Sequence, residues 1–406
     1  MSILRAKGTL DFLAAGVFYA ILAESFFIAL SPLVAEIALV VGILLYGLRL
    51  WLDKTVHFCR LPFDWPVLIF ALCGAASIAV SPNPAFSFYN YYNLAGVYLL
   101  TYILVGQNVT RPEQVRWIAV SLAAAAAIVV LYGYYQYIFG IDTSAMKWVD
   151  GDAFPELKKR VFSTWENPNI LAGYLDAAIC LVFGVFLQAG EKRQQLLLGG
   201  GMLLLAGCLA MTYARGACLT IAVVLAGYGV LKNRRILLAV IVLGAALLAL
   251  DTALAERLLS VFTKMDTSSE MRLAFWESTL AMIMDHPLLG IGWGAYWMVY
   301  PEYDFYINDA AIRIVHAHNI YLNYAAEIGI AGAIAYFTWF FGTMGMALRS
   351  KDYRSSALLN GLLLGIGLAM VSVALNGITD DVLFNIPSSM LLWFLGALAV
   401  VIEKKM

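Results

Sequence analysis

The feature that most limits the fold of this chain is a series of long apolar runs separated by short polar segments. A helix needs roughly 20 apolar residues to cross the ~30 Å hydrocarbon core of a membrane. Runs of about this length predict twelve spans, at 9–30, 33–52, 64–81, 85–106, 117–139, 168–190, 196–214, 216–231, 236–252, 318–347, 356–377 and 385–402. Only 13% of the residues are charged, about half the share found in soluble domains. We therefore expect an all-α polytopic membrane protein in which residues 1–406 form one integral membrane domain.

The distribution of basic residues predicts the orientation of the chain. If the N-terminus is cytoplasmic, most of the 26 Lys and Arg residues fall in short cytoplasmic segments, as the positive-inside rule requires. Both termini are then cytoplasmic. The first apolar run follows Arg5 and Lys7 and has no small-residue cleavage site, so we expect a retained span. The basic residues are scattered singly and in pairs, so we expect no nucleic acid as a partner. The apolar runs make membrane lipids expected partners.

Two of the outward loops are long, at 140–167 and about 253–317. The second loop, between spans nine and ten, is the only region large enough for a small extramembrane subdomain. Within it, acidic Glu270 follows two serines at a predicted helix start, and Pro287 ends the run. Apolar residues at helical spacing predict one amphipathic face that lies along the membrane interface: Leu273, Phe275, Trp276, Leu280, Ile283 and Met284.

Candidate catalytic residues lie where this loop meets span ten. The chain has four histidines, and two of them, His316 and His318, lie at the mouth of that span. Histidine exchanges protons near neutral pH, so the pair is a candidate reaction centre; the alternative is a helix cap at the membrane surface. A zinc site is less favoured, because residues two apart do not share a helix face and His286 would have to be the third ligand. We expect no metal and no other cofactor.

Three arginines on the same predicted side form a candidate anion site. Arg215 lies between two apolar spans with almost no loop, and the following span of about 16 residues is only ~24 Å long. Arg215 should therefore lie below the outer surface, where an arginine costs ~2.5–3.5 kcal/mol unless it is compensated; a snorkelling side chain is the alternative. Arg160 precedes the turn into span six, and Arg272 lies near the start of the predicted loop helix. Guanidinium groups bind phosphate oxygens bidentately, which predicts a lipid-linked phosphate or pyrophosphate.

Other patterns have ordinary explanations. Asn167, directly before Pro168, has two interpretations: it caps the following helix, or it contributes to a functional site. The segment Gly290–Gly294 mimics a dinucleotide-binding loop, but no predicted strand precedes it, so we expect a turn. Three carboxylates within the predicted spans are expected to pair with polar groups of the bundle rather than to form a proton relay: Glu24, Asp176 and Glu327.

In order and spacing, these motifs resemble the O-antigen ligase and polymerase superfamily of bacterial membrane glycosyltransferases. The resemblance runs from about Arg160 to the C-terminus. Four segments carry it: Arg160–Asn169 with its Asn-Pro-Asn, Thr212–Ala217, Arg272 followed by Asp285–Gly292, and His316–Asn319. The family commonly has serine where Ala214 stands.

The resemblance implies a metal-independent transferase with a C-type glycosyltransferase fold in the bacterial inner membrane. Its active site would be periplasmic, and its donor a glycan on undecaprenyl pyrophosphate. In the ligase branch, which we favour, the acceptor is the lipid A core. In the O-antigen or exopolysaccharide polymerase branch, the acceptor is another lipid-linked repeat unit.

By the same resemblance, Arg215 and Arg272 bind the pyrophosphate, and His318 is the base that activates the acceptor hydroxyl. The supporting residues would be His316 and Arg160, and the further candidates for substrate binding are Asn167 and Asn319. A polysaccharide transporter or flippase is the alternative of a different class. It would place its charged residues at the membrane midplane, whereas the conspicuous cations here lie on one predicted face.

Overall fold

The computed structural model describes residues 2–92, 96–140, 160–250, 254–256, 258, 267–306, 313–349 and 356–405. Throughout these residues the regular secondary structure is helical, which confirms the all-α prediction. Eight helices are long and apolar enough to cross a membrane: α1 (Ser2–Phe27), α2 (Pro32–Leu52), α6 (Pro112–Phe139), α7 (Pro168–Gln188), α9 (Arg215–Lys232), α14 (Ile320–Arg349), α15 (Ala357–Asn376) and α16 (Ile386–Lys405). The chain is therefore a multi-pass membrane protein.

Helices also occupy the other four predicted spans. Two are continuous, α8 (Lys192–Ala210) and α10 (Arg234–Leu250). The third is α3 (Asp64–Ser77), which continues into the 3-10 turn η1 (Ile78–Val80). Within the span predicted at 85–106, the structure describes α4 (Pro84–Tyr91) and α5 (Val97–Asn108).

The centre of the bundle is formed by α7, α15 and α16. Small residues let α7 and α15 approach closely, because a Cβ added at Gly184 would meet the backbone of Gly361 and Gly365. α16 is the most buried of the eight spanning helices. Its Trp393 stacks on Trp339 of α14 with 3.6 Å between the ring centroids. The C-terminal helices therefore provide the rigid frame from which the site residues project.

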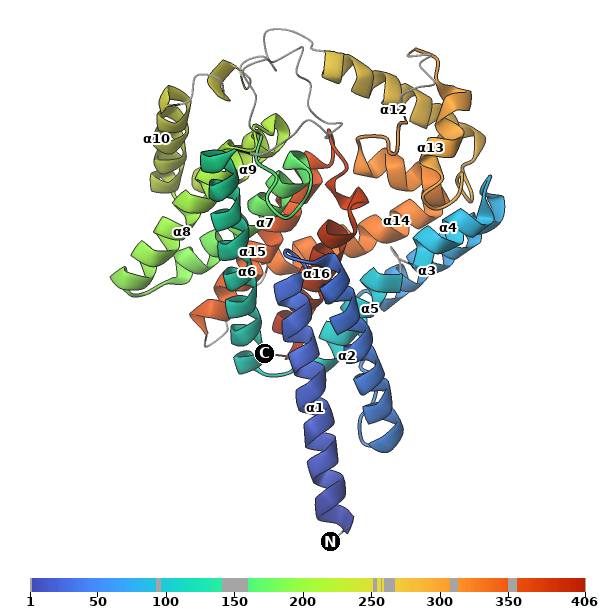
Figure 1. Cartoon of the computed structure of the whole chain (residues 1–406), viewed down its shortest axis with the longest axis vertical. Coiled ribbons are helices and arrows are strands. Elements are labelled where there is room, and N and C mark those ends of the chain that lie inside the picture. The colour runs from blue at the N-terminus through green and yellow to red at the C-terminus, as the bar shows by residue number, and fades with distance from the viewer. Residues whose placement is uncertain are drawn as a thin grey trace.

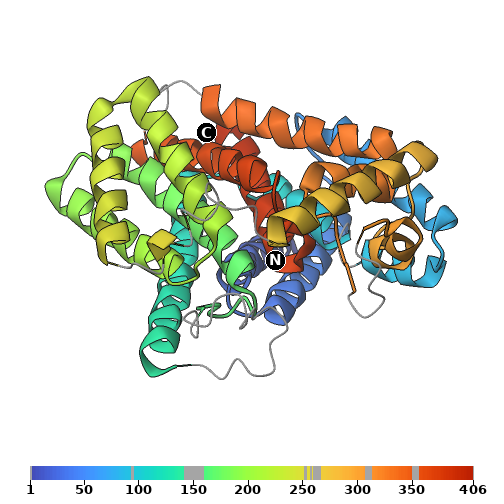
Figure 2. The same ribbon diagram turned by 90° about the horizontal axis from the view of Figure 1, so that it is seen from above.

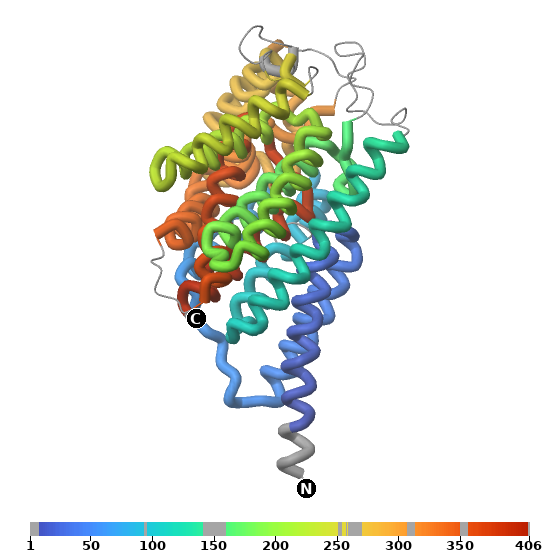
Figure 3. Tube along the Cα trace, turned by 90° about the vertical axis from the view of Figure 1, so that its left-hand side faces the viewer, coloured from blue at the N-terminus to red at the C-terminus, as the bar shows by residue number. Residues whose placement is uncertain are grey.

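The polar elements gather at one end of this frame. In Figure 1, α12 (Thr267–Asp285) and α13 (Tyr296–Val299) lie at the end opposite the N-terminus. Figure 2 shows α12 from above, lying over the orange and red C-terminal helices, and α12 contacts α14. In the side view of Figure 3, α1 extends beyond the other helices at the far end of the molecule.

The loop helix α12 forms where it was expected, but with two apolar faces instead of one. Glu270 lies in its first turn, and it ends at Asp285, before Pro287. Phe275 and Met282 are buried in a small core with α13, whereas Leu273, Leu280 and Met284 are exposed. The boundary predicted for a 253–317 subdomain stays a prediction.

A break in α14 brings the turn before α13 into the bundle. Gly329 is non-helical, with φ 76°, and a Cβ there would overlap the carbonyl group of Leu288. The opened carbonyls of Ala326 and Glu327 accept hydrogen bonds from the backbone N–H groups of Ile291 (2.8 Å) and Gly292 (3.1 Å). Gly290, Gly292 and Gly294 all have positive φ, which glycine adopts without a Cβ penalty. The expected turn at Gly290–Gly294 is confirmed.

The buried carboxylates pair with polar groups, as the sequence predicted. Glu24 accepts a hydrogen bond from the Thr101 hydroxyl at 2.6 Å, and Asp176 accepts one from Ser372 at 3.2 Å. Glu327 accepts one from the backbone N–H of Gly294 at 3.0 Å. Glu327 thereby fastens the glycine turn to α14.

Candidate active site

Three turns, each preceding a spanning helix, meet at the polar end of the bundle. They contain every described non-glycine residue with positive φ: Ser163, Glu166, Tyr213 and His318. This conformation costs of order 1–3 kcal/mol per residue and is concentrated at functional sites. The turns before α7 and α9 are joined by the hydrogen bond from Val161 N–H to the Met211 carbonyl, at 3.1 Å. The start of α14 is held by Ile320 N–H, which donates to the Gly377 carbonyl at 2.8 Å.

A chain of hydrogen bonds joins four side chains at these turns. Nδ1 of His318 lies 3.1 Å from Oδ1 of Asp380. Oδ2 of Asp380 accepts from Nδ2 of Asn169 at 3.3 Å, and Oδ1 of Asn169 accepts from Nη2 of Arg160 at 2.8 Å. Arg160 also donates through Nε to the carbonyl of Thr212 at 2.9 Å. The structure thus connects His318 to Arg160 through two intervening side chains.

The ionisation of Asp380 fixes the tautomer of His318. Burial alone would raise the pKa of Asp380, but the hydrogen bond from His318 and the electrostatic effects of His318, His316 and Arg272 outweigh it. The pKa of this carboxyl is held well below its usual value. An ionised carboxylate can only accept hydrogen bonds, so Nδ1 of a neutral His318 carries the proton and Nε2 carries a lone pair. The His318 side chain is 33% exposed, so a ligand can reach it.

His316 lies in a different environment and has a different role. It is buried, and its ring centroid is 4.2 Å from that of His318. Burial, followed by the charge of His318, lowers the pKa of His316 to about 3. Its Nδ1 accepts the backbone N–H of His318 at 3.1 Å, so the neutral ring carries its proton on Nε2. This bond holds the unusual backbone conformation of His318.

α12 covers the histidine pair and brings Arg272 to it. The ring of Phe275 lies 5.6 Å from that of His318 and nearly parallel to it, at 21°. Arg272 precedes Phe275 by three residues and is therefore on the same face of α12. Its positive charge contributes to the lowered pKa values of both His316 and Asp380.

Arg215 is the first residue of α9 and is half-buried. It follows the turn whose Thr212 carbonyl binds Arg160. The start of α9 lies against the end of α15, since a Cβ at Gly216 would be 3.2 Å from Oδ1 of Asn376. The positive end of the α9 dipole and the Arg215 guanidinium both favour an anion at this position.

The two asparagines that were predicted to bind substrate both make structural hydrogen bonds. Asn167 caps α7, because its Oδ1 accepts the Asn169 N–H at 2.8 Å. Asn319 caps α14 through the N–H groups of Tyr321 and Leu322, both at 3.0 Å, and donates to the Ile378 carbonyl at 2.9 Å. A ligand contact by either asparagine stays a prediction.

Sequence reasoning missed Asp380. Its signal was present, because Asp380 and Asp381 are adjacent carboxylates in the short outward segment between two predicted spans. Asn169 was noted only as part of the Asn-Pro-Asn turn. Neither spacing nor composition could show that these two residues, 211 positions apart, share a hydrogen bond.

Three side chains of the cluster could hold a metal ion. His316, His318 and Asp380 each offer one ligand atom, and these atoms lie within 4.8 Å of one another. The third possible metal ligand is Asp380. His286, which a zinc site was expected to need, is exposed and is not a member of the group. In the arrangement described, Nδ1 of each histidine is already engaged in a hydrogen bond. A metal would therefore need the Nε2 atoms or a rearranged network.

Two comparisons with known proteins bear on the family of this chain. Residues 200–337 match the protein-family model described as O-Antigen ligase, and this range contains Arg215, Arg272 and both histidines of the cluster. The chain is also similar to the Exopolysaccharide production protein ExoQ of Rhizobium meliloti (strain 1021). The identity is 26% over 318 residues, which cover 73% of this chain and 69% of the relative. Together with the multi-pass helical fold, these two matches support a place for the chain in the O-antigen ligase and polymerase superfamily.

Proposed function

We propose that this protein transfers a glycan from undecaprenyl pyrophosphate to an acceptor hydroxyl at the periplasmic face of the bacterial inner membrane. The observation that carries the proposal is the hydrogen-bonded pair of His318 and Asp380, which leaves Nε2 of His318 available as a base. Arg160, Arg215 and Arg272 supply positive charge around the same turns. A base beside concentrated positive charge suits the departure of a pyrophosphate anion.

The proposed step is a direct displacement. The acceptor oxygen forms a bond to the anomeric carbon of the donor glycan, while the bond from that carbon to the pyrophosphate oxygen breaks. Nε2 of His318 takes the proton of the acceptor hydroxyl, and the pyrophosphate leaves with the bonding electron pair. Asp380 stabilises the imidazolium that forms, through the hydrogen bond to Nδ1.

The arginines act on the leaving group. Arg215 and Arg272 are proposed to bind the pyrophosphate and to stabilise the negative charge that it gains, which removes the need for a metal ion. Arg160 is proposed to act through Asn169, because its guanidinium donates to that side chain. His316 is a positioning residue, since it holds the backbone of His318.

The basic-residue distribution supports a periplasmic site with both termini in the cytoplasm. A test is to replace Arg215 with cysteine and to label intact cells with a membrane-impermeant thiol reagent. Labelling from the periplasmic side is expected. Labelling that occurs only from the cytoplasmic side would contradict the orientation and the reaction proposed for that face.

Two acceptors have specific support. The family model described as O-Antigen ligase supports the ligase branch, in which the lipid A core accepts the glycan. The relative named for exopolysaccharide production supports the polymerase branch, in which a second lipid-linked repeat unit accepts it. The two branches give different products. A ligase modifies the lipid A core, whereas a polymerase lengthens the glycan on the carrier lipid.

The decisive experiment incubates the purified chain in lipid bilayers with undecaprenyl-pyrophosphate glycan, alone or with lipid A core, and identifies the products by mass. We expect transfer with no added metal and unchanged rates in excess EDTA. Loss of activity in EDTA that Zn²⁺ or Mg²⁺ restores would instead assign the cluster of His316, His318 and Asp380 to a metal. Failure to consume the donor under any of these conditions would overturn the proposed transfer.

A further inference from the structure

A cavity of about 170 Å³ adjoins the histidine turn. Phe384, which lines the cavity, has its ring centroid 5.1 Å from that of His316. Asn323 also lines it, and its Oδ1 accepts the backbone N–H of Ala317 at 3.1 Å. Asp381 in the wall is adjacent in sequence to Asp380, the partner of His318. The cavity therefore borders the turn that carries the proposed base.

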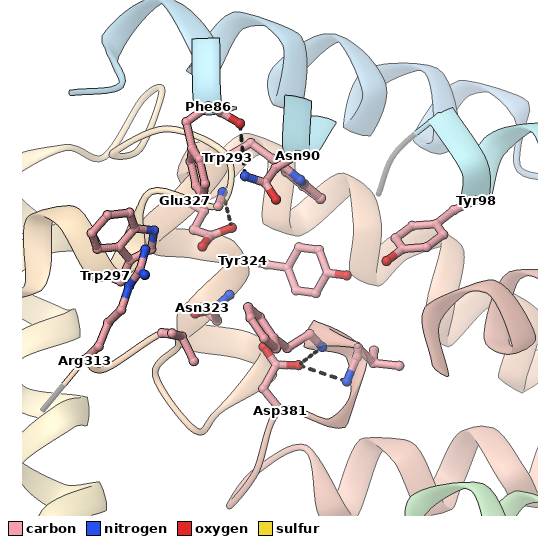
Figure 4. Close-up of a pocket in the computed structure, with 14 residues that line it drawn as sticks. Phe86, Asn90, Tyr98, Trp293, Trp297, Arg313, Asn323, Tyr324, Glu327 and Asp381 are labelled. Atoms are coloured by element: carbon pink, nitrogen blue, oxygen red, sulfur yellow. Dashed lines mark hydrogen bonds between the residues drawn. The ribbon is translucent and has the colours of Figure 1, made fainter. Parts of the chain in front are cut away.

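The wall of the cavity combines aromatic rings with amides and carboxylates. Figure 4 shows side chains from α4, the glycine turn, α14 and the segment after α15 pointing toward one another. The rings include those of Phe86, Trp293 and Trp297. The polar groups include Asn90, Asn323, Glu327 and Asp381. This mixture matches a sugar, which presents apolar C–H faces and a rim of hydroxyl groups.

Asp381 offers an oxygen atom to a ligand. The side chain is 5% exposed, and its Oδ1 accepts the backbone N–H groups of Leu383 and Phe384, both at 3.1 Å. Within the described residues, its Oδ2 accepts no hydrogen bond. A ligand hydroxyl in the cavity can donate a hydrogen bond to this oxygen.

The charged groups of the cavity favour an uncharged ligand over a phosphate. Glu327 and Asp381 are acidic, and the one basic residue among the described lining residues, Arg313, lies over the ring of Trp297, 3.3 Å from its centroid. The arginines of the neighbouring turns are the more favourable place for an anion.

We propose that this cavity binds the terminal uncharged sugar of the acceptor, an inference that rests on the proposed glycan transfer. Its size fits one ring, because an engineered cavity of roughly 150 Å³ is known to hold a benzene molecule. The cavity places the acceptor beside His318 and separates it from the pyrophosphate of the donor. Trp297 and Asp381 are its proposed binding residues.

A second and larger cavity extends the same surface. Its volume is about 410 Å³, and it shares Asn90 and Phe384 with the first cavity. Glu36, Glu166 and Trp165 contribute to its wall, so it repeats the combination of carboxylate and aromatic groups. The next sugars of the acceptor glycan would lie there.

The test uses a small probe, methyl β-glucopyranoside, with the full chain in lipid nanodiscs and ligand-observed saturation-transfer NMR. We expect saturable binding with a Kd of order 1 mM, the weak range typical of one small ring. The acidic probe methyl β-glucuronide should bind about 10-fold more weakly, because its carboxylate meets Glu327 and Asp381. Inorganic pyrophosphate should not displace the glucoside.

Two variants and one control locate the binding. Trp297→Ala should weaken glucoside binding about 10-fold, because it removes a ring of the aromatic wall together with the support for Arg313. Asp381→Asn preserves the oxygen that caps Leu383 and Phe384, and should reduce the discrimination against the glucuronide. Trp117→Ala removes an exposed ring of α6 and should change neither value.

The two proposals fail in different ways. If the glucoside does not bind saturably, or if Trp297→Ala leaves its binding unchanged, the cavity inference is wrong, whatever the transfer assay shows. Equal binding of the glucuronide, or displacement by pyrophosphate, would contradict it as well. If the glucoside binds as expected but the wild-type chain transfers no glycan, the proposed function fails and the cavity still binds sugars.

Discussion

The two carboxylates after α15 are neighbours in sequence but belong to opposite environments. Asp380 faces the histidines, Asn169 and the charge of Arg272, and its pKa is lowered. Asp381 lines the aromatic cavity, and burial followed by the charge of Asp380 raises its pKa to about 7. Asp380 therefore belongs to a cationic region, and Asp381 belongs to an acidic region.

The comparison suggests how one small site handles two chemically different substrates. The cationic region, formed by Arg160, Arg215 and Arg272, suits the pyrophosphate of the donor. The acidic cavity suits the uncharged hydroxyl groups of an acceptor. The histidine turn lies at their junction, because His318 bonds to Asp380 while His316 contacts Phe384 of the cavity. In the proposed reaction, a base at that junction would take a proton from a hydroxyl on one side while the leaving group departs on the other.

The largest expected effect comes from removing the base between the two regions. His318→Ala should lower kcat for transfer by about 10²–10⁴-fold, the usual contribution of a general base. Folding and membrane insertion should persist, since alanine leaves the backbone bonds of the turn in place. Transfer is measured with the reconstituted chain under saturating donor and acceptor.

The matched control for this variant is His286→Ala. His286 is exposed and lies just beyond the end of α12, outside the histidine cluster. Its replacement should leave kcat unchanged. Equal losses in the two variants, or full activity of His318→Ala, would remove His318 from the proposed role.

A second pair of variants contrasts the arginines of the two regions. Arg272→Gln should lower kcat/KM for the donor by about 10²–10³-fold, the cost of removing one group that stabilises a developing anion. Arg313→Gln, in the acidic region, should change the KM for the acceptor and leave kcat/KM for the donor unchanged. The measurement is steady-state kinetics with each substrate varied in turn. If both variants lowered kcat/KM for the donor to a similar extent, donor binding would not be confined to the cationic region.

The third effect is smaller and concerns the orientation of the base. In a hydrolytic triad, losing the orienting carboxylate costs about two orders of magnitude less than losing the base. We therefore expect Asp380→Asn to lower kcat by about 10–100-fold, because the amide can donate to Nδ1 and force the wrong tautomer. Acceptor KM should stay near the wild-type value. A change in acceptor KM alone would instead assign Asp380 to binding.

The fold could be predicted because membrane-spanning helices are long and apolar over a continuous stretch. Such a stretch is a local property of the sequence, so the helices formed near the expected boundaries. The exception required tertiary information. The helix α14 is broken at Gly329, where the glycine turn supplies the missing hydrogen bonds.

The candidate site was only partly predictable for the same reason. His316, His318 and the arginines are conspicuous because cationic groups are rare in an apolar chain. Asp380 is conspicuous only once folding places it 3.1 Å from a histidine that lies 62 residues away. The aromatic cavity was invisible, because Trp293 and Glu327 come together only through the break in α14.

The smallest expected effect is on stability and tests the environment of Asp381. Its pKa rises from 3.8 to about 7, so the folded state holds a proton that the unfolded state releases. The free energy of unfolding contributed by this group therefore falls as pH rises from about 4 to about 7. The asparagine of Asp381→Asn does not titrate, so its contribution does not change with pH. It keeps an oxygen that can accept the backbone N–H groups of Leu383 and Phe384. The Tm of this variant minus the Tm of the wild type should therefore grow by a few degrees between pH 5 and pH 8. Each kcal/mol of unfolding free energy corresponds to a Tm shift of about 2–4 °C. Asp11→Asn, at an exposed position of α1, is the control and should show no such trend. A Tm difference that is constant with pH would mean that Asp381 is ionised in the folded protein at low pH, and the acidic cavity would then carry a full charge throughout.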